Sequence, residues 1–223
     1  MRRTLFFDLD GTILDTAERQ YHVFSTCAAR CGIEVLVDRE GFWVGKRNGM
    51  RNLDLLAPGT PPDRVTVFRQ AWMDLIEDRE SLRLDSPFEG IQDALGSLAV
   101  DNDLLLATLR QSRSNLEWQL DHWGLARYFR SLLVGHPTSP QDKARLICDY
   151  LRSRTGPGES VLIGDSEMDI QTGVQLGFTT IACAYGQRTA ERLRAHHPDH
   201  MAWEARQISH VIANLDPNPG TGT

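Results

Sequence analysis

The chain has 223 residues, 41% of them hydrophobic and 24% charged, and its formal net charge is −6. These proportions are those of a globular protein with a sizeable core, and they exclude fibrous and membrane-embedded classes. The acidic balance argues against a nucleic-acid partner, because nucleic-acid-binding surfaces gain affinity by neutralising phosphates.

The start of the chain is apolar, but Asp8 and Asp10 interrupt it before an export segment could form. No later stretch is long enough to cross a bilayer, so no membrane partner is expected. The four cysteines are few and irregularly spaced, which is typical of free thiols in a reducing compartment. They are Cys27, Cys31, Cys148 and Cys183. We therefore expect a cytoplasmic protein.

Short apolar segments of β-rich composition predict strands over residues 4–8, 104–108, 131–134, 161–164 and 179–184. Helical patterns lie between them, which indicates an α/β fold with a Rossmann-like parallel sheet covered by helices on both faces. In such sheets ligands bind beyond the carboxyl ends of the strands, so the residues there are the candidates for function.

A long helical stretch separates the first two predicted strands. Asp15 or Thr16 caps a helix whose apolar positions recur at spacings of three and four, and Gly32 ends it. Thr60, followed by Pro61, begins a second helix. The sequence therefore predicts a core domain of residues 1–14 and 87–215, an inserted helical cap domain of residues 15–86, and a disordered tail of residues 216–223.

Two carboxylates follow the first predicted strand. Asp8 and Asp10 point the same way because side chains alternate along a strand, and Gly11 permits a tight turn after them. One carboxylate can attack and bind a cation while the other handles protons. An ordinary turn is the alternative, since Asp, Gly and Thr are common turn residues.

Other strand ends add complementary groups. Thr108 offers a hydroxyl, Asp165 a carboxylate, and Lys143 an ammonium after the third predicted strand. A transferring phosphoryl group needs its oxygens' charge balanced more than it needs covalent chemistry, and this set supplies that balance. The combined pattern favours phosphoryl transfer.

At these residues the chain resembles the haloacid dehalogenase (HAD) superfamily of phosphatases, and within it the phosphoglycolate-phosphatase-like group with a helical cap. The resemblance covers nearly the whole chain. Its most specific parts are residues 8–12 and 164–169, while Thr108 and Lys143 match two weaker motifs. It implies a Mg²⁺-dependent phosphomonoesterase that acts on a small phosphorylated metabolite through a phospho-aspartate.

The resemblance also implies roles. Asp8 is the nucleophile and Asp10 the general acid and base, while Thr108 and Lys143 bind the transferred phosphoryl group. Asp165 and the backbone carbonyl of Asp10 join Asp8 around Mg²⁺.

Asp169 has two interpretations. It is a metal ligand by resemblance, and it is also the last residue of a helix-capping box that begins at Ser166. A second capping box over residues 139–142 places Lys143 in the first turn of a helix, where a cation opposes the helix dipole, so its position favours function.

The sequence departs from the commoner family pattern after Thr108, where Leu109 and Arg110 replace small polar residues. We expect Leu109 to contact the substrate and Arg110 to lie on the surface. Residues 42–51 of the cap gather three cations, including Lys46 and Arg47, between and around two glycines. We expect Lys46 and Arg47 to bind the substrate, with a solvated loop as the alternative.

Two other functions remain open. A sugar phosphomutase of the same superfamily would keep every residue named above, and a non-enzymatic phospho-acceptor module would share the aspartate, threonine and lysine. The substrate and the oligomeric state do not follow from the sequence.

Overall fold

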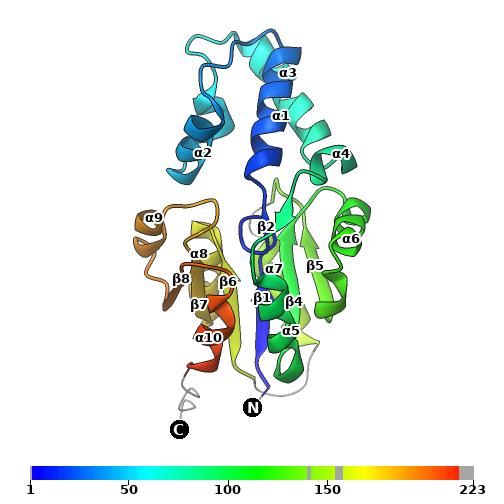
Figure 1. Ribbon diagram of the computed structural model, residues 1–223, viewed down its shortest axis with the longest axis vertical. Helices are drawn as coiled ribbons and strands as arrows, with labels where there is room; N and C mark the ends of the chain where they lie inside the picture. Colours follow the sequence, from blue (N-terminus) through cyan, green and yellow to red (C-terminus); the bar gives the residue numbers. More distant parts are fainter. Residues whose placement is uncertain (1, 140–141, 154–157, 216–223) are drawn as a thin grey trace.

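The computed structural model describes residues 2–139, 142–153 and 158–215. At its centre is a six-stranded sheet in the order β5-β4-β1-β6-β7-β8, and all neighbouring strands run parallel (Figure 1). The strands are β1 (Thr4–Phe7), β4 (Asp103–Leu109), β5 (Ser131–Gly135), β6 (Ser160–Gly164), β7 (Thr179–Cys183) and β8 (His200–Ala202). The predicted α/β fold is confirmed. The sequence did not predict β8, which has only three residues and no Val, Ile, Thr, Phe, Tyr or Trp among them.

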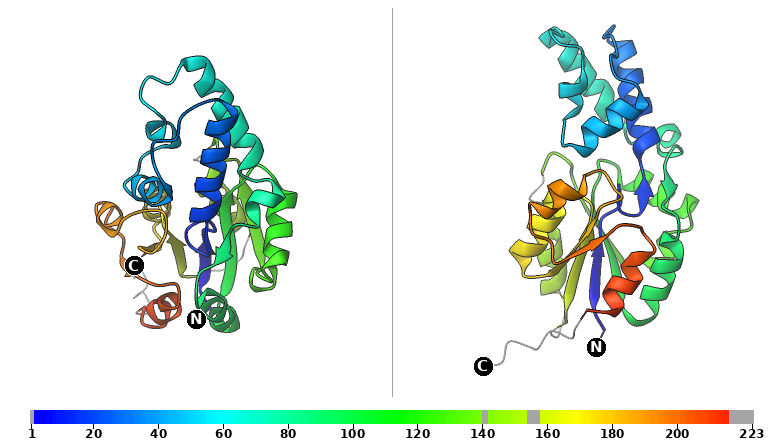
Figure 2. Two further views of the ribbon diagram at one scale, coloured as in Figure 1. Left: turned by 45° about the horizontal axis from the view of Figure 1, so that its top comes forward. Right: turned by 60° about the vertical axis from the view of Figure 1, so that its left-hand side comes forward.

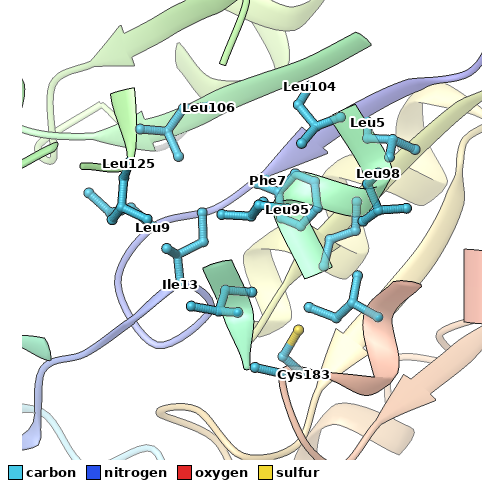
Figure 3. Packing of buried hydrophobic residues seen from close by; sticks show 14 of the residues in the cluster. Leu5, Phe7, Leu9, Ile13, Leu95, Leu98, Leu104, Leu106, Leu125 and Cys183 are labelled. Carbon is cyan, nitrogen blue, oxygen red and sulfur yellow. The ribbon is translucent and has the colours of Figure 1, made fainter. Parts of the chain in front are cut away.

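Strand β1 is buried along its whole length because it lies between β4 and β6. Its side chains alternate between the faces. Leu5 and Phe7 join the larger hydrophobic cluster, which Figure 3 shows, and Phe6 joins the cluster on the other face. Helices α5 (Ile91–Asp101) and α10 (Gln207–Ala213) cover the first face, and α7 (Asp142–Arg152) and α8 (Glu167–Leu176) cover the second.

A helical unit lies beyond one end of the sheet (Figures 1 and 2). It consists of α1 (Ala17–Arg30), α2 (Arg39–Arg47), the 3-10 helix η1 (Asn52–Leu55), α3 (Pro62–Leu75) and α4 (Arg79–Leu82). The unit has a hydrophobic cluster of its own, in which the Phe24 ring lies 4.8 Å from that of Phe42 and 5.7 Å from that of Phe68.

Two short strands join this unit to the sheet. Strand β2 (Leu14–Asp15) pairs antiparallel with β3 (Ser86–Pro87). The chain leaves the sheet domain at β2 and returns to it at β3, and each part has its own hydrophobic cluster. Both features support the proposed division into a core domain and a cap domain at residues 14/15 and 86/87.

The structure decides two local details that the sequence left open. The carboxylate of Asp15 accepts a hydrogen bond from the Ala17 amide at 2.9 Å, whereas Thr16 makes no side-chain cap. Most of the segment 42–51 is helical rather than a loop, because α2 extends to Arg47. The carboxylate of Asp38 caps the start of this helix by accepting a hydrogen bond from the Gly41 amide at 2.8 Å.

The remaining elements are α6 (Arg113–His122), the 3-10 helix η2 (Ala126–Tyr128) and α9 (Ala190–Arg194). Residues 140–141 of the second predicted capping box and the predicted tail lie outside the described residues. The four cysteines are free thiols. No helix within the described ranges is both long enough and apolar enough to span a bilayer.

Candidate active site

The carboxyl ends of the central strands open into a cavity of about 220 Å³. Six residues singled out from the sequence line it. They are Asp8, Asp10, Thr108, Leu109, Lys143 and Asp165. Asp8 follows β1 and Asp165 follows β6, while Thr108 lies near the end of β4, so the order of the strands brings them together.

Lys143 bridges two carboxylates. Its Nζ lies 2.6 Å from Oδ1 of Asp8 and 2.5 Å from Oδ1 of Asp169. Burial alone would lower the pKa of Lys143, but Asp169 and Asp8 outweigh it and raise the pKa. The lysine therefore stays charged and holds Asp8 in place beside the cavity.

Asp8, Asp165 and Asp169 form a cluster in which one oxygen from each lies within 4.8 Å of the others. Burial raises the pKa of Asp8 to about 7, and the negative charge of Asp169 adds to it, against the pull of Lys143. Burial, then Asp8 and then Asp169, raise the pKa of Asp165 well above its ordinary value. A cation beside the three carboxylates would offset the burial and mutual repulsion that raise the pKa values of Asp8 and Asp165.

Glycines make room for this cluster. A Cβ atom on Gly11, whose φ is +85°, would lie 2.1 Å from Oδ2 of Asp165, and one on Gly164 would lie 2.3 Å from Cγ of Asp169. These close approaches leave no space for side chains there. The oxygen ligands and their spacing fit Mg²⁺, which prefers carboxylates and water.

Asp169 combines its two predicted features. Its Oδ2 accepts hydrogen bonds from the Ser166 amide at 3.1 Å and hydroxyl at 2.5 Å, so the capping box is present. Its Oδ1 faces Lys143. The capping box therefore orients the residue and leaves one oxygen toward the cluster, while direct metal ligation by Asp169 stays a prediction.

Asp10 lies between two arginines. Its Oδ1 is 2.6 Å from Nη2 of Arg110 and 3.0 Å from Nη2 of Arg19. Burial alone would raise the pKa of Asp10, but Arg110 and Arg19 together lower it. The surface position expected for Arg110 is wrong, because this side chain is 2% exposed and also donates to Gln119. Pairing with Asp10 makes that burial possible.

The sequence reasoning did not single out Arg19, whose side chain is 2% exposed. Its Nε lies 2.9 Å from Asp85, which itself precedes β3. A signal was present, since Arg19 shares a helical stripe with Val23 and Cys27 at spacings of four, and both are buried. An arginine on a buried stripe requires acidic partners.

The two cap cations turn away from the cavity. Lys46 donates to Oδ1 of Asn52 at 2.9 Å, and Arg47 donates to the Ala184 carbonyl at 2.7 Å. Neither is among the described residues that line the cavity. Burial, and then the charge of Arg188, lower the pKa of Lys46 to about 8. Arg188, which the sequence reasoning missed, lines the cavity instead.

Comparisons with known proteins agree with this geometry. The family model described as haloacid dehalogenase-like hydrolase matches residues 5–183. The chain is 23% identical to the pyrophosphatase PpaX of Oceanobacillus iheyensis, with 95% of this chain and 97% of that protein covered. It is 24% identical to a phosphoglycolate phosphatase of Synechococcus elongatus, with 96% and 98% covered.

Among solved structures, that of a predicted phosphatase from Clostridium acetobutylicum is similar, with a TM-score of 0.76 and 20% identity over 96% of this chain and 100% of that one. That likeness supports the fold. The match of the family model to most of the chain shows more, and the chain belongs to the family of haloacid dehalogenase-like hydrolases.

Proposed function

We propose that the chain is a Mg²⁺-dependent phosphomonoesterase that hydrolyses a small phosphorylated metabolite in the cytoplasm through a phospho-aspartate on Asp8. The observation that carries the proposal is the position of Asp8 at the end of β1, bound to Lys143 and grouped with Asp165 and Asp169. Only a carboxylate held beside positive charge can both ionise and approach a phosphate dianion.

In the first step an oxygen of Asp8 attacks phosphorus and the bond to the leaving oxygen breaks. Asp10 gives a proton to that oxygen, so the leaving group departs as an alcohol. Lys143 and the hydroxyl of Thr108 hold the phosphoryl oxygens. Asp8, Asp165, Asp169 and the backbone carbonyl of Asp10 would hold Mg²⁺, which supplies further positive charge at these oxygens.

In the second step Asp10 takes a proton from water, and the water oxygen attacks phosphorus. The bond to Asp8 breaks, and inorganic phosphate leaves. The lowered pKa of Asp10 keeps this carboxylate ionised between Arg19 and Arg110, which suits the base. To act as the acid, Asp10 must hold a proton when the substrate is bound, although Arg110 and Arg19 favour its ionised form.

The cavity sets the scale of the substrate. Sites for drug-sized ligands have roughly 300–1,000 Å³, and this cavity has about 220 Å³. We therefore propose a substrate with a short leaving group. Two relatives are named for pyrophosphate and phosphoglycolate chemistry, so both compounds belong in the first test panel.

The test is phosphate release from that panel, a sugar 1-phosphate and an aryl phosphate, with Mg²⁺ and with EDTA. Mg²⁺-dependent release supports the proposal. Conversion of the sugar phosphate to an isomer without release of phosphate would instead show a phosphomutase. A folded protein that becomes phosphorylated, but releases no phosphate and forms no isomer from any compound, would be a phospho-acceptor module.

A further inference from the structure

Arg188 joins the cavity to the cap. It follows β7 and lines the cavity together with the catalytic carboxylates. Its Nε donates to Glu167 at 2.9 Å, and its Nη1 donates to the Lys46 carbonyl, at the end of α2, at 3.1 Å. No described residue accepts a hydrogen bond from its Nη2, although the side chain is only 23% exposed. One face of a half-buried guanidinium is therefore available to a ligand.

The surroundings of Arg188 carry an excess of positive charge. Glu167 is the shared partner of Arg188 and Arg192, so one carboxylate serves two guanidiniums. The end of α2, with Lys46 and Arg47, contacts the loop between β7 and α9, which carries Arg188 (Figure 1). We call this contact the seam. Burial, and then repulsion from the Arg188 guanidinium, lower the pKa of Lys46.

Two cations among the described residues line the cavity, Lys143 and Arg188, and different partners hold them. Lys143 is fixed to Asp8 and Asp169, on the side where the phosphoryl group reacts. Arg188 comes from a different loop and is not bound to those carboxylates. A phosphoryl group held at Lys143 therefore leaves Arg188 for a second charged group on the substrate.

We propose that Arg188 is a specificity-determining residue that binds a second anionic group, a carboxylate or a further phosphate, on the leaving portion of the substrate. The inference rests on the proposed phosphatase function. Because the cavity is small, the second anion must lie within a few bonds of the ester oxygen. The substrate class is a short phosphomonoester, or phosphoanhydride, with two anionic ends.

A purely structural role for Arg188 is the competing explanation, and Arg192 provides the matched control. Arg192 pairs with the same Glu167 at 2.8 Å and donates to the carbonyl of Asn48, at the end of the same helix, at 3.1 Å. It does not line the cavity. Loss of Arg192 therefore removes an equivalent seam contact without removing a cavity cation.

The first experiment compares Arg188→Gln and Arg192→Gln on 2-phosphoglycolate and on its neutral amide, and on pyrophosphate and methyl phosphate. We expect Arg188→Gln to raise KM for whichever anionic compound the wild type prefers by about tenfold to a hundredfold, the range for a hydrogen bond to a charged group. KM for the neutral partner should change less than about threefold. Arg192→Gln should change KM for the two members of each pair by the same factor. The two pairs distinguish a carboxylate from a phosphate.

The inference is overturned if the wild type prefers neither anionic compound over its neutral partner, or if both variants lower activity on both members in the same proportion. A second measurement does not depend on turnover. In the Asp8→Asn protein, calorimetric titration should show tighter binding of the preferred anionic compound than of its neutral partner, and Arg188→Gln should remove that difference. If the wild type turns over none of the compounds while this difference in binding persists, the proposed reaction is wrong and the binding role of Arg188 stands. If the difference is absent, Arg188 does not read a second anion.

Discussion

The guanidinium of Arg19 lies 3.0 Å from the carboxylate of Asp10, so the first turn of the cap's first helix holds the proposed acid and base of the sheet domain. The same side chain reaches Asp85 at 2.9 Å and the Ile76 carbonyl at 3.0 Å. One arginine therefore links both chain crossings between the sheet and the helical unit. Such a contact has consequences for stability as well as for catalysis.

Replacement of Arg19 by methionine should lower the free energy of unfolding by about 3–5 kcal/mol, because it leaves Asp85 buried without its cation. Arg39→Met is the control, since the Arg39–Glu18 pair is exposed and should contribute less than about 1 kcal/mol. Urea denaturation measures both. Equal losses of unfolding free energy in the two variants would mean that the buried contact of Arg19 contributes no more than an exposed ion pair.

Asp85 predicts a pH dependence of stability. Burial raises its pKa from 3.8 to about 6, against the pull of Arg19. Between about pH 4 and pH 6 the folded protein therefore binds more protons at this site than the unfolded chain, and the free energy of unfolding falls as the pH rises. As the pH rises across this window, the free energy of unfolding of Asp85→Asn should rise by about 2–3 kcal/mol relative to that of the wild type.

A control of opposite sign is available for that measurement. Hydrogen bonds from Arg51 lower the pKa of Asp54 to about 2, so Asp54 stabilises the fold above about pH 4 and loses this effect as the pH falls. Asp54→Asn should therefore lose stability relative to wild type as the pH rises from about 2 to 4. An Asp85→Asn difference that does not vary between pH 4 and 6 would contradict the raised pKa.

Substitution of Asp10 by asparagine should reduce turnover of an alkyl phosphate about 10²- to 10⁴-fold, because no side chain would then protonate the leaving oxygen. With an aryl phosphate the first step needs less protonation and should lose less, as a burst of phenol in rapid-mixing experiments would show. Equal losses in the first step for the two substrates would remove Asp10 from the role of leaving-group acid.

Metal dependence should be sensitive to the glycine that faces Asp169. EDTA should abolish activity and Mg²⁺ restore it. Gly164→Ala should raise the Mg²⁺ concentration for half activity about 10- to 100-fold, because the new Cβ would displace Asp169. Gly96→Ala is a suitable control, since its Cβ would meet only Tyr128, at 3.5 Å. An unchanged Mg²⁺ requirement in Gly164→Ala would mean that the position of Asp169 does not affect metal binding.

The sequence was sufficient to place residues that depend on strand ends. Asp8, Thr108 and Asp165 follow or end buried strands, and the parallel sheet brings such positions together whatever the cap does. Arg19 and Arg188 depend instead on how the helical unit packs on the sheet domain. The helical stripe of Arg19 indicates burial, but local patterns do not show which groups the packing brings against either arginine.

The same limit explains two cation assignments. Arg110 follows a strand and carries a full charge, so surface exposure was the natural expectation. Its burial required knowledge that Asp10 and Gln119 would face it. The cluster around Lys46 was recognised as cationic, but only the three-dimensional contacts show that Arg188, and not Lys46 or Arg47, lines the cavity.

A phosphoryl group carried on Asp8 during turnover can be detected by mass spectrometry. The enzyme is mixed with substrate and Mg²⁺, quenched in acid during turnover, and digested for mass spectrometry. We expect the peptide containing Asp8 to gain one phosphoryl group, and the folded Asp8→Asn protein to show neither this species nor turnover. Full turnover by Asp8→Asn, or a phosphoryl group found on a different residue during turnover, would contradict this expectation.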